Sequence, residues 1–270
     1  MGTLRWHGIG GNGKGWREVR AIGIDAGPVL ALSFEPMTRI DLVIFDCDGV
    51  LIDSEVISAN MLIAELKGYG VEMTLEFVSR HFLGRSYPVV LSEVRERYGV
   101  KLPDTFEADY RARLLAAFER NLVVMPGVTA TIAALARPYC LATSSSPERL
   151  AQSLRLTGLT EVFGPNTFTA TRVRRGKPAP DLFLFTATEM GAAPAHCLVI
   201  EDSLMGVQAG LAAGMQVWRF TGGSHLRGLD LTEPEASRAH RQFDNFADFY
   251  ATRPDLRHQG PHISAGALPA

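Results

Sequence analysis

Short apolar runs alternate with helix-like stretches along most of this chain, and this alternation limits the possible folds more than any other feature. The first run, residues 40–46, is rich in β-branched and apolar residues, as expected for a buried strand. Similar runs, each followed by a helical pattern, lie at residues 138–143, 196–202 and 215–220, with a weaker one at 167–173. Strands that alternate with helices form a parallel sheet covered on both faces. The sequence therefore predicts an α/β fold with a doubly wound, mostly parallel sheet and a Rossmann-like core.

A long helical block interrupts this alternation directly after the first strand. Residues 54–124 show helical spacing with glycine stops and contain no convincing strand. We therefore expect an inserted all-helical cap domain at 54–124. The α/β core would then comprise residues 38–53 and 125–252.

The two ends of the chain differ from the core in composition and in residue pattern. Residues 1–37 are glycine-rich and lack a regular pattern, so we expect a flexible leader or a mis-called translation start, because Met37 begins a plausible native sequence. Near the other end, residues 243–250 could form one last helix. Residues 253–270 are expected to be a disordered tail.

Composition excludes several classes of protein. The formal net charge of −2 gives no overall attraction to nucleic acid or to an anionic membrane. No apolar stretch approaches the roughly 18 residues that would span a bilayer. The three cysteines, Cys47, Cys140 and Cys197, each lie inside an apolar run, as expected of buried thiols in a reducing compartment. These features predict a cytoplasmic protein that binds neither nucleic acid nor membranes.

Asp46 and Asp48 stand at the end of the first apolar run, in the segment LVIFDCDGVLIDSE at residues 42–55. Buried carboxylates are unfavourable unless they are paired or bind a cation. Other polar groups end or soon follow the later runs, namely Thr143 and Ser144, Lys177, and Glu201 with Asp202. Because ligands of open α/β sheets bind at the carboxyl ends of the strands, we expect these groups to meet in one crevice. There the carboxylates would bind a cation and face the positive charge of Lys177.

Each of these features also has an ordinary structural explanation. An Asp-x-Asp segment before a glycine is often only a turn. Serines before Pro-Glu commonly cap a helix, and a Glu-Asp pair after a strand is often an exposed corner. Their occurrence in this order, each after a strand, favours a site for phosphate chemistry.

Four ordered segments carry a family resemblance. They are DCDGVLIDSE, LATSSS, GKPAPDLF and VIEDSLMGVQAGLAAGM. With them the chain resembles the haloacid dehalogenase-like hydrolases, and in particular the branch that holds β-phosphoglucomutases and bacterial sugar-phosphate phosphatases. The resemblance covers about residues 38–225. It implies phosphoryl transfer in a crevice that a helical cap closes.

The resemblance also implies roles for individual residues. Asp46 would be the nucleophile that forms an aspartyl-phosphate, and Asp48 would act as acid and then as base. Thr143 and the Ser144 amide would hold the phosphoryl oxygens, while Lys177 would offset their charge in the transition state.

Mg²⁺ is the cofactor that the resemblance implies. The family pattern gives it Asp46, the backbone carbonyl of Asp48, and Asp202, with Glu201 acting through water. A hard cation of this kind prefers oxygen ligands and a few carboxylates.

The resemblance leaves several activities to be weighed. Dehalogenases of the family lack the second aspartate, so Asp48 argues against them. β-Phosphoglucomutases carry a histidine where this chain has Ser58, and their cap motif spaces its arginine differently from Gly84 and Arg85 here. We therefore expect hydrolysis, with a phosphomutase as the alternative. A binding-only regulator is disfavoured because Asp46, Asp48 and Asp202 are all present.

The cap would choose the leaving group. Its candidates for contact with sugar hydroxyls or a carboxylate are Glu55, Arg80, Arg85 and Arg113. A lid that closes favours a small substrate, so we expect a phosphorylated sugar or sugar acid, bound by a monomer or a weak homodimer.

Some features stay open between structural and functional interpretations. The basic cluster of Arg172, Arg174 and Arg175 could form an anion-attracting rim or contact the substrate. His225 could lie near the mouth of the site, whereas His196 is expected to be structural. Cys47 should turn away from the two aspartates, because side chains alternate along a strand, and it is therefore expected in the core.

Overall fold

The computed structural model describes residues 39–259, so the expectation for the leader at residues 1–37 lies outside the described part. Its centre is a six-stranded sheet in the order β3-β2-β1-β4-β5-β6, in which every neighbouring pair is parallel. The strands are β1 (Leu42–Phe45), β2 (Tyr139–Thr143), β3 (Thr167–Thr169), β4 (Cys197–Glu201), β5 (Gln216–Phe220) and β6 (Arg241–Phe243). The predicted parallel sheet is confirmed.

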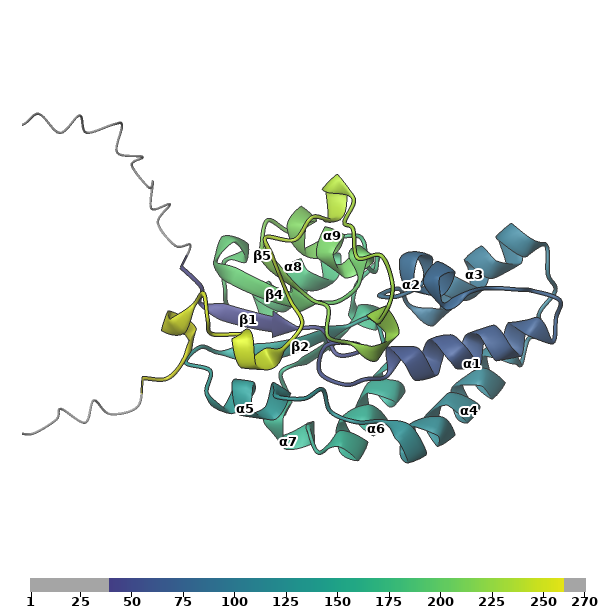
Figure 1. Ribbon diagram of the computed structural model, residues 1–270, viewed down its shortest axis with the longest axis horizontal. Coiled ribbons are helices and arrows are strands. Elements are labelled where there is room, and N and C mark those ends of the chain that lie inside the picture. The colour runs from purple at the N-terminus through teal and green to yellow at the C-terminus, as the bar shows by residue number, and fades with distance from the viewer. Residues whose placement is uncertain (1–38, 260–270) are drawn as a thin grey trace, which may run out of the picture. The chain divides into compact units, whose positions relative to one another are not determined.

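Helices cover both faces of this sheet (Figure 1). One face packs against α5 (Val128–Ala133), α6 (Pro147–Thr157) and α7 (Thr160–Phe163), and the other against α8 (Asp181–Glu189) and α9 (Leu204–Ala212). Successive residues of β1 serve the two faces in turn, because side chains alternate along a strand. Val43 and Phe45 belong to the first hydrophobic cluster, whereas Leu42 and Ile44 belong to the second. This double coverage explains why β1 is apolar without interruption.

The helical insertion follows β1 and has a hydrophobic cluster of its own. It contains α1 (Glu55–Lys67), α2 (Leu75–His81), α3 (Tyr87–Tyr98) and α4 (Phe106–Asn121). Leu66, Val94 and Phe118 lie at the centre of that cluster. The segments that lead into and out of the insertion lie side by side, since the Asp53 amide donates to the Val123 carbonyl at 3.0 Å. The four helices of the insertion thus share one hydrophobic cluster, and the insertion begins and ends at neighbouring points of the chain. Among the described residues, no helix is both long enough and apolar enough to cross a membrane.

The last part of the chain differs from expectation. Residues 243–250 do not form the predicted α-helix: β6 ends at Phe243, and a single 3₁₀ turn follows at Phe246–Asp248. The reason is that Phe243 pairs with Phe220 of β5 as the last residue of β6, while Phe246 and Phe249 pack on the aromatic side chains of β5.

The disordered tail predicted at residues 253–270 is wrong for its described part, 253–259. Leu256 is fully buried, and its carbonyl accepts a hydrogen bond of 2.7 Å from the Ala136 amide. The His258 amide donates to Ala134 at 2.8 Å. These residues therefore complete the core beside α5, and residues 260–270 lie outside the described part.

Candidate active site

The central strand β1 sets the position of the candidate site. After β1 the chain builds β2 and β3 on one side of it and then returns to place β4 on the other side. This reversal is the switch point at which open α/β sheets bind ligands. Asp46 directly follows β1, Thr143 ends β2, and Glu201 ends β4. The expected meeting of these groups at one edge of the sheet is confirmed.

Lys177 connects two of the carboxylates. Its side chain is fully buried, and Nζ donates to Asp46 Oδ1 at 2.6 Å and to Glu201 Oε1 at 2.7 Å. Burial alone would lower the pKa of Lys177, but the two carboxylates outweigh it and raise the pKa above its usual value. Lys177 is therefore a fixed positive charge beside Asp46.

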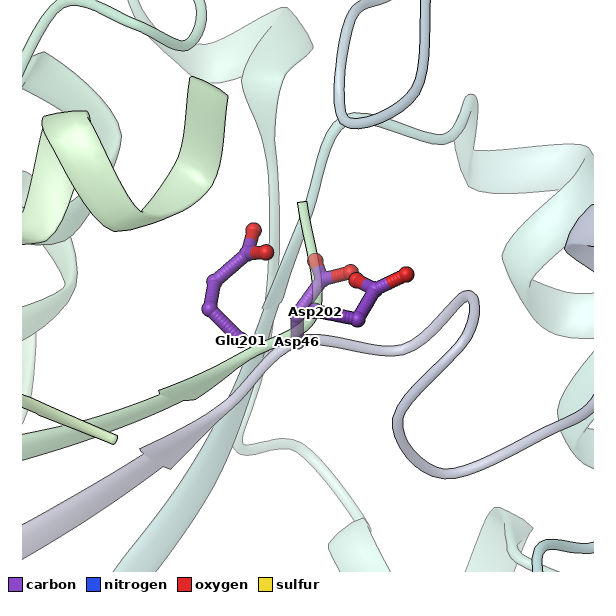
Figure 2. A group of neighbouring side chains, drawn as sticks. All are labelled: Asp46, Glu201 and Asp202. Carbon is purple, nitrogen blue, oxygen red and sulfur yellow. The ribbon is translucent and has the colours of Figure 1, made fainter. Parts of the chain in front are cut away.

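Three carboxyl groups gather at the ends of β1 and β4 (Figure 2). One oxygen from each of Asp46, Glu201 and Asp202 lies within 4.8 Å of the others, and all three side chains are buried. Burial raises the pKa of Asp46 and of Asp202, and the charges of the neighbouring carboxylates raise both further. A divalent cation would offset this repulsion, and oxygen donors of this kind suit Mg²⁺. The residues therefore fit a divalent metal ion.

The three carboxylates are not equally free to bind an ion. Glu201 Oε1 accepts from Lys177, and Oε2 accepts from the Ser203 amide at 2.8 Å and from the Ser203 hydroxyl at 3.0 Å. Gly206 makes room for this arrangement, since a Cβ there would lie 1.6 Å from Glu201 Oε1. By contrast, Asp202 Oδ2 has no hydrogen-bond partner among the described residues. Asp46 and Asp202 are thus the better placed direct ligands.

Asp48 lies in a tight ring of donors. It accepts hydrogen bonds from the hydroxyls of Ser54 and Ser145, both at 2.6 Å, and from Arg149 Nη2 at 2.7 Å. Burial by itself would raise the pKa of Asp48, but Arg149 and the two serines together lower it. Asp48 is accordingly held as a carboxylate in this arrangement.

Arg149 is a site residue that the sequence analysis missed. It lies in the first turn of α6, where its amide donates to the Ser146 hydroxyl that caps the helix. Its guanidinium reaches Asp48 in the core, Ser58 in α1 at 3.2 Å, and the ring of Phe118 in α4. The only feature of the sequence that could have indicated Arg149 is its position three residues after the serine run.

The loop after β2 joins the core to the helical insertion. Thr143 is buried and its hydroxyl accepts from the Ser145 amide at 3.1 Å. The Ser144 hydroxyl donates to the carbonyl of Gly84, in the loop between α2 and α3, at 2.7 Å. Ser144 therefore ties the insertion to the edge of the site.

A cavity of about 610 Å³ lies between the core and the insertion. Asp46, Asp48 and Thr143 line it from the core, and Glu55 and Arg85 line it from the insertion. Burial, together with the charge of Asp48, raises the pKa of Glu55 to about 8. Arg85 Nη1 is paired with Glu93 in α3 at 2.5 Å.

The other basic side chains divide between cavity and surface. Arg80 and Arg113 do not line this cavity in the described part of the chain, and Arg113 instead forms a two-point ion pair with Glu65. Arg111, which the sequence analysis did not single out, lines the cavity and donates to the Ser146 hydroxyl at 2.9 Å. Within the basic cluster, Arg174 lines the cavity.

The remaining candidates are placed as follows. Arg172 and Arg175 pair with acids of α8. His225 is fully buried with Nε2 2.9 Å from Asp202 Oδ2, whereas His196 contacts Asp41 at the opposite end of the strands. Cys47 is buried in the core cluster, where burial raises its pKa.

Comparisons with known proteins agree with this geometry. The family model described as haloacid dehalogenase-like hydrolase matches residues 40–214. The 6-phosphogluconate phosphatase of Escherichia coli (strain K12) is 31% identical over 191 residues, which cover 70% of this chain and 86% of the relative. Hexitol phosphatase A of the same organism is 32% identical over 189 residues, covering 64% of this chain and 80% of the relative.

A solved structure shows the same arrangement of the chain. A haloacid dehalogenase family hydrolase from Deinococcus radiodurans R1, with bound phosphate and sodium, superposes with a TM-score of 0.64 at 32% identity. The match covers 83% of this chain and 100% of that one. This chain is thus a phosphatase-type enzyme, and it belongs to the haloacid dehalogenase-like hydrolase family.

Proposed function

We propose that this protein is a Mg²⁺-dependent phosphatase that hydrolyses a small phosphorylated sugar or sugar acid through an aspartyl-phosphate. The observation that carries the proposal is the buried cluster of Asp46, Lys177, Glu201 and Asp202, of which Asp46 also lines the cavity. Buried carboxylates crowded around a single lysine are unfavourable as a purely structural feature. They are useful where a phosphoryl group and a cation must be held together.

In the first half of the reaction, Asp46 is the nucleophile. A carboxylate oxygen of Asp46 forms a bond to phosphorus while the bond from phosphorus to the leaving oxygen breaks. Lys177, at 2.6 Å from Asp46, offsets the charge of the phosphoryl oxygens, and Thr143 and the Ser144 amide hold them. Asp46, Asp202 and the Asp48 carbonyl, with Glu201 acting through water, would hold Mg²⁺, and a bound cation would supply the positive charge that lets two anions approach.

Asp48 handles the proton in both halves. It gives a proton to the leaving alkoxide and then takes one from the water that attacks the aspartyl-phosphate. The contacts from Arg149, Ser54 and Ser145 favour the carboxylate form. We infer that substrate binding loosens these contacts, so that Asp48 can be protonated when the leaving group departs.

The helical insertion is proposed to act as a cap that selects the leaving group. Glu55 and Arg85 line the cavity from its side, and Ser144 contacts its Gly84 loop. A cavity of about 610 Å³ is of the size that takes a small metabolite. The two Escherichia coli relatives, a 6-phosphogluconate phosphatase and a hexitol phosphatase, support sugar acids and sugar alcohols as first candidates.

Hydrolysis is preferred over phosphoryl transfer between sugars. At the position where β-phosphoglucomutases carry a histidine, the Ser58 hydroxyl donates to the Ser54 carbonyl at 3.0 Å and accepts from Arg149. A serine tied up in this way supports the phosphatase over the mutase. A cytoplasmic monomer or weak homodimer remains the prediction for the state of the protein, and its three free, buried cysteines are consistent with a reducing compartment.

The test is phosphate release from a panel of sugar and sugar-acid phosphates with Mg²⁺, beside an assay for β-glucose 1-phosphate isomerisation primed with the bisphosphate. We expect phosphate release from a few members of the panel and no isomerisation. Isomerisation with little release would replace the phosphatase by the mutase. Full activity in EDTA would remove Mg²⁺ from the mechanism.

A further inference from the structure

His225 is a buried histidine with no role in the mechanism described above. It lies in a short 3₁₀ turn, Ser224–Leu226, shortly after β5, and its side chain is fully buried. Its Nε2 lies 2.9 Å from Asp202 Oδ2, although the pair is not in hydrogen-bond geometry. A histidine packed this closely against a carboxylate of the site needs an explanation.

The surroundings of His225 leave room for an imidazole and for little else. Gly49 has a φ of +79°, and a Cβ there would lie 2.1 Å from Asp202 Oδ2 and 3.0 Å from His225 Cε1. A Cβ on Gly223 would lie 2.6 Å from the same ring carbon. Two glycines thus form a slot that holds the ring against Asp202.

The turn that carries His225 is also fixed to the loop after Asp48. The amide and the hydroxyl of Ser224 both donate to Asp53 Oδ1, at 3.2 and 2.8 Å. This attachment holds the ring in register with the segment that contains Asp46 and Asp48. The position of His225 is therefore fixed both by the two glycines and by the attachment of its turn to Asp53.

His225 does not belong to the group of carboxylates that can share an ion. Asp46, Glu201 and Asp202 each bring an oxygen within 4.8 Å of the others, and among the described residues His225 brings no nitrogen into that group. Three neighbouring atoms nevertheless lack hydrogen-bond partners in the described part: Asp202 Oδ2 and both ring nitrogens of His225. Unpartnered buried polar atoms are unfavourable, and a ring N–H and a carboxylate oxygen would satisfy each other.

We propose that His225 is a positioning residue for Asp202, whose carboxylate it orients for the divalent cation by donating a ring N–H to Oδ2. The inference rests on the proposed Mg²⁺-dependent function. Residues that orient a ligand in this way typically change metal affinity by about 10- to 100-fold when they are replaced. His225 acts on the cation through Asp202 and does not touch it.

The test measures Mg²⁺ binding to the full chain, stripped with a chelator, by isothermal titration calorimetry. The variant His225→Phe keeps a flat ring without an N–H, and His225→Gln restores an N–H at a similar reach. His196→Phe is the matched control, because His196 also contacts an aspartate, but at the opposite end of the strands. Thermal unfolding in EDTA shows whether each variant is folded.

We expect His225→Phe to weaken Mg²⁺ binding about 10- to 100-fold, His225→Gln to recover most of it, and His196→Phe to leave it unchanged. Unchanged affinity in folded His225→Phe, or an equal loss in folded His225→Gln, would overturn the inference. If neither variant folds, the ring ¹⁵N signals of His225 in the unmodified protein decide, because they should shift on addition of Mg²⁺ and an absent shift contradicts the role. An unmodified protein that binds no Mg²⁺ at all would instead count against the proposed function.

Discussion

A single carboxylate, Asp46, carries the proposed chemistry, because it is the nucleophile and a metal ligand at once. Asp46→Asn keeps the shape of the side chain and still accepts from Lys177, but it removes the nucleophilic charge. We expect at least a 10³-fold loss of turnover, on the order of 4 kcal/mol in the barrier. The fold should survive, since replacing one of several crowded carboxylates relieves repulsion.

Steady-state phosphate release and thermal unfolding measure the two effects of Asp46→Asn. Asp244→Asn, at an exposed position after β6, is the control and should change neither. Substantial turnover in pure Asp46→Asn would disprove the aspartyl-phosphate route.

Glu55 gives a second prediction, on pH. Its pKa is about 8 in the fold, whereas an ordinary glutamate has the value 4.5. Between pH 4.5 and about 8 the folded state therefore holds a proton that the unfolded state has lost, so stability falls as the pH rises, by up to about 1.4 kcal/mol per pH unit. In Glu55→Gln this contribution disappears, and the variant should gain stability over the unmodified protein toward pH 8.

Urea unfolding at pH 5 and pH 8, in EDTA, checks the prediction. Exposed Glu96, on α3, provides the control Glu96→Gln, which should keep the pH dependence of the unmodified protein. A stability difference between Glu55→Gln and the unmodified protein that is equal at both pH values would show that Glu55 titrates normally.

A site residue can be predicted from the sequence when the pattern of its own segment determines its position. Asp46, Glu201 and Asp202 each stand at the end of an apolar run, so the strand pattern alone places them at one sheet edge. Arg149 and Arg111 could not be found in this way. Their contacts depend on how α6 packs against α4 and against the loop after β1, and no pattern within one segment reports that packing.

At the scale of elements, the strands were foreseen where they are buried on both faces. The apolar residues of β1, β2, β4 and β5 leave a clear signal. The edge strand β6 has three residues, RQF, and within residues 39–259 it pairs only with β5, so it has neither the length nor the alternation that a prediction needs.

The loop between α2 and α3 supplies the prediction at this scale. Gly84 has a φ of +76°, and a Cβ there would lie 2.1 Å from Ser203 Oγ. Gly84→Ala should therefore push the loop away from Ser203 and weaken its contact with Ser144. We expect kcat/KM to fall about 10-fold or more, because the displaced loop would hinder the proposed closure of the insertion over the site.

Gly70→Ala is a matched control for Gly84→Ala. Gly70 also lies in the insertion and has a φ of +78°, but a Cβ there meets no atom within 4 Å. Both variants carry the same backbone strain of about 1–2 kcal/mol, so a difference in kcat/KM reports the contact alone. Equal activity of the two variants would show that the contact with Ser203 does not matter for turnover.

At the scale of the whole molecule, the charge of the site and the stability of the fold are linked. The sheet edge gathers Asp46, Glu201 and Asp202 in a buried position, where burial first of all, and then repulsion among the carboxylates, raises the pKa of Asp46 and of Asp202. A cation that binds this cluster binds only the folded chain, because the three residues are brought together by folding. Mg²⁺ should therefore stabilise the protein by mass action.

The last prediction is the size and the specificity of that stabilisation. At a Mg²⁺ concentration of about 100 times its dissociation constant, the gain is about 2.7 kcal/mol, or roughly 5–10 °C in Tm for a domain of this size. Thermal unfolding in EDTA and in rising Mg²⁺ measures it, and Asp202→Asn should abolish the Mg²⁺-dependent part while leaving the fold intact in EDTA. A Tm that is independent of Mg²⁺ would mean that Lys177 alone balances these carboxylates, and the buried cluster would then be an ion-pair network and not a metal site.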